Sequence, residues 1–233
     1  MRKIEILTSR LAAAALGCAL LASIPFASSS ARADAPPSAA DLLFERPQLK
    51  ALKSGDDLTY AYTFHSSDPT LFGPSFDDNI DLRIAPGAGP DTRNVDVRLF
   101  SGEHRRPAGP FDDVSSNPLL ILMLEENIQR LATVFHANPQ YMKTAIRLAL
   151  RNATATPDKA EGFDPAAPAW QVSVQPFRDD PNKERMHGLD SLTYVFHVSG
   201  AAPGEITAID IAARDASGAV LFEETTRYVR KTP

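Results

Sequence analysis

The stretch LTYAYTFHSS (Leu58–Ser67) alternates large apolar residues with small or polar ones, and LTYVFHVSG (Leu192–Gly200) repeats the pattern more than a hundred residues later. An alternation of period two predicts a β-strand with one buried face and one exposed face. We expect both stretches to be strands of one sheet with their aromatic residues on the same face. Either an internal duplication or the shared alternation alone accounts for the similarity.

Each of these stretches is followed by two further segments with strand character. Asn79–Ile84 and Asn94–Phe100 follow the first, and Glu205–Ala213 and Ala219–Val229 follow the second. Loops rich in Gly, Pro and Asp separate the segments, which is typical of antiparallel hairpins. We therefore expect two three-stranded meanders, with Trp170–Val174 as one more strand between them.

A helical insert is expected between the meanders, at about residues 117–151. Asn-Pro pairs at Asn117 and Asn138 are typical helix starts, because Asn caps the first turn and Pro suits the first helical position. The pattern predicts one helix over Pro118–Phe135 and a second over Pro139–Arg151. The first begins with six apolar residues, and burial of each is worth about 1.5–3 kcal/mol. We expect it to pack against the aromatic face of the sheet.

These elements predict an α+β fold: a curved antiparallel sheet, or half-barrel, of about seven strands, with the helical pair inserted between two three-stranded meanders. Residues 58–230 are expected to form a single α+β domain, large enough to bury a core without disulfides. A tether and arm would precede it at residues 34–57.

Residues 1–33 have the features of a secretory signal peptide. Basic residues precede an apolar run, and Ala31-Arg32-Ala33 fits the small-residue cleavage pattern, so we expect export and cleavage after Ala33. The apolar run is interrupted by Pro25 and is too short for a membrane helix, so we do not expect an integral membrane protein. Gly17 precedes Cys18, the one cysteine of the chain, which leaves lipidation at Cys18 as an alternative.

Charge and cysteine content exclude several functions for the mature chain. Removal of residues 1–33 takes away four basic residues and one acidic residue, so the formal net charge changes from −5 to −8. Such a charge argues against binding of nucleic acid. Without Cys18 the chain also has no thiol for a nucleophile, a thiolate metal site or an iron–sulfur cluster.

Two groups of residues are candidate binding sites. A sheet wrapped around an apolar helix either is solid throughout or leaves room for an apolar ligand. The expected wall of such a pocket is Tyr60, Tyr62, Phe64, Tyr194 and Phe196, with Leu120, Met123 and Leu124 as a plug. The second group is the polar loop SGEHRR (Ser101–Arg106), in which Glu103, His104, Arg105 and Arg106 could bind a partner protein.

No pattern in the sequence predicts catalysis. The five histidines (His65, His104, His136, His187 and His197) include no pair at zinc-ligand spacing, and nucleophile elbows and phosphate-binding glycine loops are missing. Two Phe-Asp-Asp triplets, at residues 76–78 and 111–113, suit turns better than a calcium loop. We therefore expect a non-enzymatic protein without a metal or another cofactor.

The order of several segments resembles that of a group of exported proteins of Gram-negative bacteria that have no assigned activity. The similarity covers most of Phe44–Val229, and the segments that carry it are FERPQLKALKSGDDLTYAYTF, VDVRLFSGEHRR, NPLLILMLEENIQRLATVF and NPQYMKTAIRLAL. The expected fold is also similar in outline to the periplasmic lipoprotein-carrier half-barrels. The resemblance implies a periplasmic location but assigns no functional residue.

The sequence thus leads to two functional hypotheses. In the first, a non-enzymatic periplasmic protein binds an apolar ligand, such as a lipid or an acyl chain, within a half-barrel. In the alternative, the chain is an envelope protein–protein interaction module that has no ligand and docks through SGEHRR.

Overall fold

A computed structural model describes residues 36–230. The predicted signal peptide, its cleavage site after Ala33 and Cys18 lie outside the described residues.

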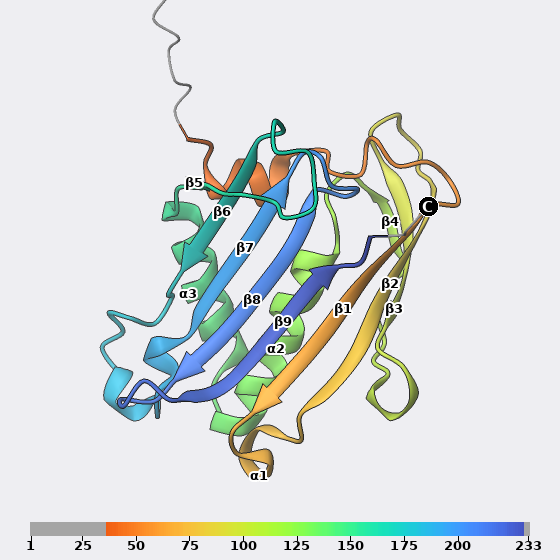
Figure 1. The fold of residues 1–233 in the computed structure, drawn as a ribbon. Coiled ribbons are helices and arrows are strands. Elements are labelled where there is room, and N and C mark those ends of the chain that lie inside the picture. Colours follow the sequence, from red (N-terminus) through yellow and green to blue (C-terminus); the bar gives the residue numbers. More distant parts are fainter. Residues whose placement is uncertain (1–35, 231–233) are drawn as a thin grey trace, which may run out of the picture. The chain divides into compact units, whose positions relative to one another are not determined.

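The described chain contains one open, curved antiparallel sheet (Figure 1). Its spatial order is β4-β3-β2-β1-β9-β8-β7-β6-β5. The strands are β1 (Asp57–Ser66), β2 (Phe76–Pro86), β3 (Arg93–Leu99), β4 (Phe111–Val114), β5 (Thr156–Pro157), β6 (Ala169–Val174), β7 (Thr193–Ser199), β8 (Ile206–Arg214) and β9 (Val220–Tyr228).

The sheet has nine strands, so the prediction of about seven was wrong. The additional strands are β4 and β5, with four and two residues. Both lie at the edges of the sheet, and neither contains the apolar alternation that identifies a half-buried strand. Their pairing with β3 and β6 comes from the tertiary structure.

The two predicted meanders are confirmed. Strands β1, β2 and β3 pair in sequence, as do β7, β8 and β9, and β6 continues the second meander. The meanders join where β1 pairs with β9, with Tyr62 opposite Thr226. The two similar strands β1 and β7 are therefore separated by β9 and β8.

Both predicted helices form within one residue of their expected bounds, as α2 (Leu119–Phe135) and α3 (Pro139–Asn152). Asn138 is the N-cap of α3, and its Oδ1 accepts a hydrogen bond from Gln140 N at 2.9 Å. The N-cap of α2 is Pro118, one residue later than predicted, and Asn117 Oδ1 accepts a hydrogen bond from Leu119 N at 3.1 Å. The remaining helical segments are short: η1 (Asp41–Glu45), α1 (Pro69–Phe72), η2 (Gly102–His104), η3 (Lys183–Arg185) and η4 (Leu189–Ser191).

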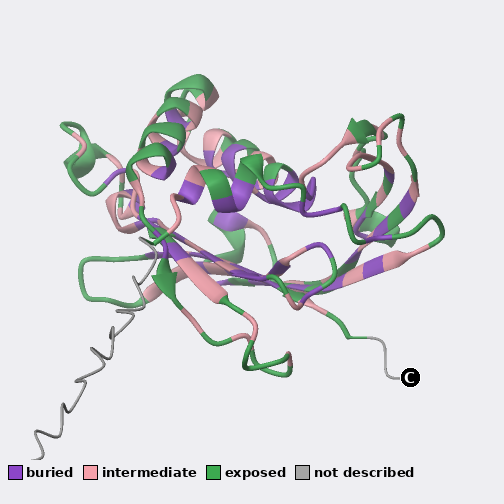
Figure 2. Ribbon diagram, turned by 90° about the horizontal axis from the view of Figure 1, so that it is seen from above, coloured by how far each residue is buried: buried purple, intermediate pink, exposed green. Residues whose placement is uncertain are grey.

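The helical pair lies on one side of the sheet, and the buried residues gather on the surfaces that face each other (Figure 2). The sheet contributes its aromatic face and α2 contributes one side of its apolar run. At most 1% of each of these side chains is exposed: Tyr60, Tyr62, Phe64, Tyr194, Phe196, Leu120 and Met123. Helix α2 therefore packs directly onto the aromatic face, as the six-residue apolar run predicted.

A carboxylate is buried within this apolar interface. Glu224 on β9 is 1% exposed and accepts hydrogen bonds from Tyr62 Oη (2.9 Å) and Asn127 Nδ2 (2.7 Å). Arg130 Nε lies 3.6 Å from Glu224 Oε1, which makes an ion pair. Asn127 Oδ1 in turn accepts a hydrogen bond from Tyr194 Oη at 2.8 Å. Burial raises the pKa of Tyr62 and of Tyr194, so both phenols remain protonated donors.

The chain before β1 forms an arm, residues 36–52, that packs against the domain. Gln48 accepts a hydrogen bond from Asn117 N at 2.8 Å and donates one to Leu42 O at 2.9 Å. Asn117 Nδ2 donates to Tyr60 Oη and to Gly204 O, both at 3.0 Å. A Cβ atom at Gly204 would lie 2.9 Å from Asn117 Nδ2, so this close approach requires glycine. The arm is thus tied to the start of α2.

Replacement of Glu224 by alanine tests the contribution of the buried carboxylate. Glu224→Ala leaves Arg130, Asn127 and Tyr62 without their partner, so we expect the free energy of unfolding to fall by about 3 kcal/mol. Glu223→Ala, at the half-buried neighbouring position on the other face of β9, is the matched control and should cost at most about 0.5 kcal/mol. The measurement is urea denaturation of both variants, and equal midpoints would contradict the assigned role.

Candidate functional site: a groove between the arm and the helical pair

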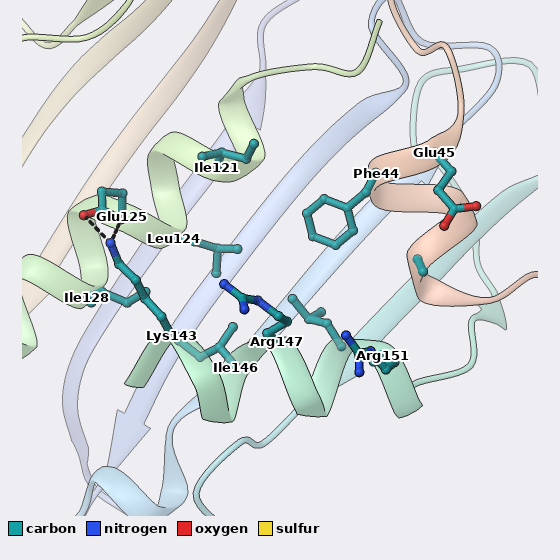
Figure 3. A pocket seen from close by; sticks show the side chains of 12 residues that line it. Phe44, Glu45, Ile121, Leu124, Glu125, Ile128, Lys143, Ile146, Arg147 and Arg151 are labelled. Atoms are coloured by element: carbon teal, nitrogen blue, oxygen red, sulfur yellow. Dashed lines mark hydrogen bonds and ion pairs between the residues drawn. The ribbon is translucent and has the colours of Figure 1, made fainter. Parts of the chain in front are cut away.

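A groove of about 490 Å³ lies between η1, α2 and α3, on the flank of α2 that is turned towards α3 and η1 (Figure 3). Its apolar lining comprises Ala40, Phe44, Ile121, Leu124, Ile128, Ile146 and Leu150. Its charged lining comprises Glu45, Glu125, Lys143, Arg147 and Arg151.

Helical periodicity explains why α2 reaches both the sheet and the groove. Successive residues of an α-helix are turned by about 100° around its axis, so an apolar run of six residues covers more than one face. Leu120, Met123 and Asn127 face the sheet, whereas Ile121, Leu124, Glu125 and Ile128 line the groove. The apolar run at the start of α2 thus supplies two faces, and the sheet covers one of them.

Helix α3 contributes an apolar stripe flanked by basic residues. Its groove residues are Lys143, Ile146, Arg147, Leu150 and Arg151, which recur at intervals of three, four, seven and eight residues. Ile146 and Leu150 are buried and lie beside α2, while Arg147 and Arg151 are exposed. In Figure 3 the Arg147 side chain extends from α3 into the space between α2 and η1.

Two large apolar side chains at the rim of the groove are exposed to solvent. Ile121 is 53% exposed and Phe44 is 38% exposed, whereas the floor residues Ile128, Ile146 and Leu150 are 3–4% exposed. An exposed apolar residue alone carries no functional meaning, but apolar residues gathered around a concave surface are typical of a binding site. The groove therefore offers apolar surface that a ligand can cover.

Two of the charged side chains that line the groove form an ion pair with each other, whereas its two arginines do not form one with any described residue. Lys143 Nζ lies 2.8 Å from Glu125 Oε2, and hydrogen bonds from Lys143 and Gln129 lower the pKa of Glu125. No described residue within 36–230 forms an ion pair or a side-chain hydrogen bond with Arg147 or Arg151. These two guanidinium groups are free to bind an anion.

The predicted ligand-binding residues are divided between the two sides of α2. The wall residues Tyr60, Tyr62, Phe64, Tyr194 and Phe196 are buried beneath α2, together with Leu120 and Met123. Leu124 is half-buried and lines the groove. The remaining groove residues were not predicted as a site. One signal in the sequence could have indicated this groove: basic residues recur at positions 143, 147 and 151, beside the apolar stripe of α3.

In the loop SGEHRR, two of the four predicted partner-binding residues, His104 and Arg106, make contacts within the protein. His104 stacks on Phe76 with ring centroids 4.0 Å apart, and Glu103 Oε1 lies 3.9 Å from His104 Nε2. Arg106 donates hydrogen bonds to the backbone carbonyls of Glu103, His104 and Arg105 at 2.9–3.4 Å. Arg106 thus stabilises the turn itself, while Glu103 and Arg105 are exposed.

The two histidines of the similar strands have different environments. His65 on β1 is exposed. His197 on β7 has Nδ1 2.7 Å from Asp158 Oδ2 and Nε2 3.3 Å from Asp210 Oδ2, and Arg227 also pairs with Asp210. Hydrogen bonds to Asp210 and Asp158 raise the pKa of His197. Across residues 36–230, no group of three or more His, Cys, Asp or Glu side chains is arranged to hold a metal ion.

The comparisons with known proteins leave the assignment of function to the structure. No protein-family model matches the chain, and no curated protein matches it. Within residues 36–230, every helix is too short or too polar to cross a membrane.

The environment of His197 predicts a pH-dependent contribution to stability. Because its pKa is raised on folding, the contribution is fully present below pH 6.5, the ordinary pKa of histidine, and is lost as the pH rises through the raised value. His197→Gln should therefore lower the free energy of unfolding by about 1.5 kcal/mol at pH 5.5, and by less at pH 9. Thermal denaturation across this pH range measures the difference.

The control is His65→Gln, at the equivalent but exposed position on β1. It should change stability little at either pH. A His197→Gln effect that is as large at pH 9 as at pH 5.5 would show that packing, rather than the charge of the imidazolium, is responsible.

Proposed function

We propose that the protein is a non-enzymatic periplasmic protein that binds an apolar chain, such as the acyl chain of a lipid, in the groove between η1, α2 and α3. The observation that carries this proposal is the apolar floor of the groove together with the exposed apolar rim formed by Ile121 and Phe44. The periplasmic location follows from the expected signal peptide.

The dimensions and chemistry of the groove support a small apolar ligand. Its volume of about 490 Å³ lies within the range of about 300–1,000 Å³ that is usual for small-molecule sites. Its floor is made of aliphatic side chains, and burial of apolar surface contributes about 25 cal/mol per Å². A chain laid along the groove would cover Ile121, Phe44 and Leu124 at once.

The proposed site is on the flank of α2 beside α3 rather than between α2 and the aromatic face of the sheet. The aromatic face of the sheet is in contact with α2, and Tyr62 and Tyr194 are committed to hydrogen bonds with Glu224 and Asn127. A ligand there would have to displace the helix and break these buried bonds. The groove needs no such change.

The titratable groups of the groove favour binding over catalysis. Glu125 is paired with Lys143, and its lowered pKa makes it a poor proton donor or acceptor near neutral pH. Arginine side chains remain protonated and bind anions without exchanging protons. These residues can hold and orient a ligand.

Binding of the neutral apolar dye N-phenyl-1-naphthylamine to the purified protein tests the proposal. Ile121→Asp places a carboxylate at the rim of the groove, so we expect the dissociation constant of the dye, measured by fluorescence titration, to rise at least tenfold. Leu148→Asp is the matched control, because Leu148 is similarly exposed (56%) on α3 but does not line the groove. Equal effects of the two variants, or no dye binding, would refute the groove as the site.

Native mass spectrometry of the protein purified under mild conditions provides a second measurement. A bound mass that organic solvent removes would support ligand binding and identify the ligand. If the protein carries no such mass and does not bind the dye, the alternative of an interaction module becomes the better explanation. Charge reversal of Arg105 and Arg106 should then abolish capture of its partner.

A further inference from the structure

Two arginines of the groove lie on one face of α3, four residues apart. Arg147 and Arg151 both line the groove, and no described residue neutralises either of them. The last turn of a helix favours basic residues in general, which accounts for a cation at Arg151. This preference does not explain why both arginines line the groove beside the buried aliphatic residues Ile146 and Leu150. Figure 3 shows both arginines and Ile146 on α3.

The balance of charge around the groove also favours an anion. Three basic and two acidic side chains line it, and Glu125 is already paired with Lys143. The other carboxylate, Glu45, projects from η1 and forms no ion pair with Arg147 or Arg151. One monoanion beside Arg147 and Arg151 would neutralise the net positive charge of the lining.

From this arrangement we infer that the ligand is a fatty acid, with its carboxylate on Arg147 and Arg151 and its alkyl chain along Leu124, Ile128 and Ile146. The inference rests on the proposed function, since it specifies the end group of the chain bound in the same groove. The guanidinium group presents a planar pair of donors that matches a carboxylate in geometry. An adjacent alkyl chain excludes water from one side of the contact and strengthens the charge interaction.

Competition among chains of equal length tests the end group. Dodecanoate, 1-dodecanol and dodecylamine, each below its aggregation concentration, are titrated against the protein loaded with N-phenyl-1-naphthylamine. We expect dodecanoate to displace the dye at a concentration at least tenfold lower than 1-dodecanol, and dodecylamine to be the weakest competitor. The advantage of dodecanoate should decrease as sodium chloride is added, since salt screens exposed charges.

A double variant identifies the residues responsible. Arg147→Gln with Arg151→Gln should abolish the advantage of dodecanoate while leaving displacement by 1-dodecanol unchanged. The matched control is Arg105→Gln with Arg106→Gln, which removes two exposed arginines that do not line the groove and should preserve the order of the three competitors. If the variant with Arg147→Gln and Arg151→Gln still prefers dodecanoate to 1-dodecanol, these two arginines do not bind the carboxylate.

The outcomes separate this inference from the proposed function. If the dye binds in the groove but the three chains compete equally, the fatty-acid inference fails and binding of an apolar chain stands. If the dye does not bind, or Ile121→Asp does not affect it, the proposed function fails. Dodecyl phosphate provides a last comparison. If it displaces the dye at a tenfold lower concentration than dodecanoate, the inferred carboxylate end group is wrong and a phosphate end group replaces it.

Discussion

Glu224 lies in the buried interface between the sheet and α2. The position of α2 on the sheet in turn determines which of its residues line the groove. Apolar packing alone permits a helix to slide or rotate on an aromatic surface, because apolar contacts have little directionality. Hydrogen bonds are directional, and Asn127 makes two of them to strands that flank β8: it donates to Glu224 on β9 and accepts from Tyr194 on β7. We infer that these bonds set the register of α2 on the sheet.

The register of α2 has a direct consequence for its other face. With Leu120, Met123 and Asn127 turned to the sheet, the helical period of about 100° per residue places Ile121, Leu124 and Ile128 on the adjacent flank of the helix, roughly a quarter of a turn away. Helix α3 covers part of that side and the arm approaches it from a third direction. The groove is the apolar surface of α2 that neither of them covers. It exists because the apolar run is wider than the surface that the sheet can bury.

The arm and the polar face of the sheet are also connected. Ser38 pairs with Thr154, and Ala39 N donates a hydrogen bond to Ala153 O, so the arm is joined to the segment that enters β5. Four residues beyond Thr154, Asp158 is bonded to His197 on β7. The bond between Asp158 and His197 on β7 thus helps to hold the segment that the arm contacts, and the arm forms one wall of the groove.

Local patterns in the sequence determined the elements of this protein and their order. Alternation predicted β1, β2, β3, β6, β7, β8 and β9, and the Asn-Pro pairs predicted the helix starts, because both signals depend on residues close together in the chain. The tertiary structure alone decided the pairing of β1 with β9, the edge strands β4 and β5, and which side of α2 carries the groove. Each depends on contacts between segments far apart in sequence. The aromatic residues predicted as a ligand wall became core for this reason: their alternation indicates which face of a strand is buried, but not whether a helix or a ligand covers it.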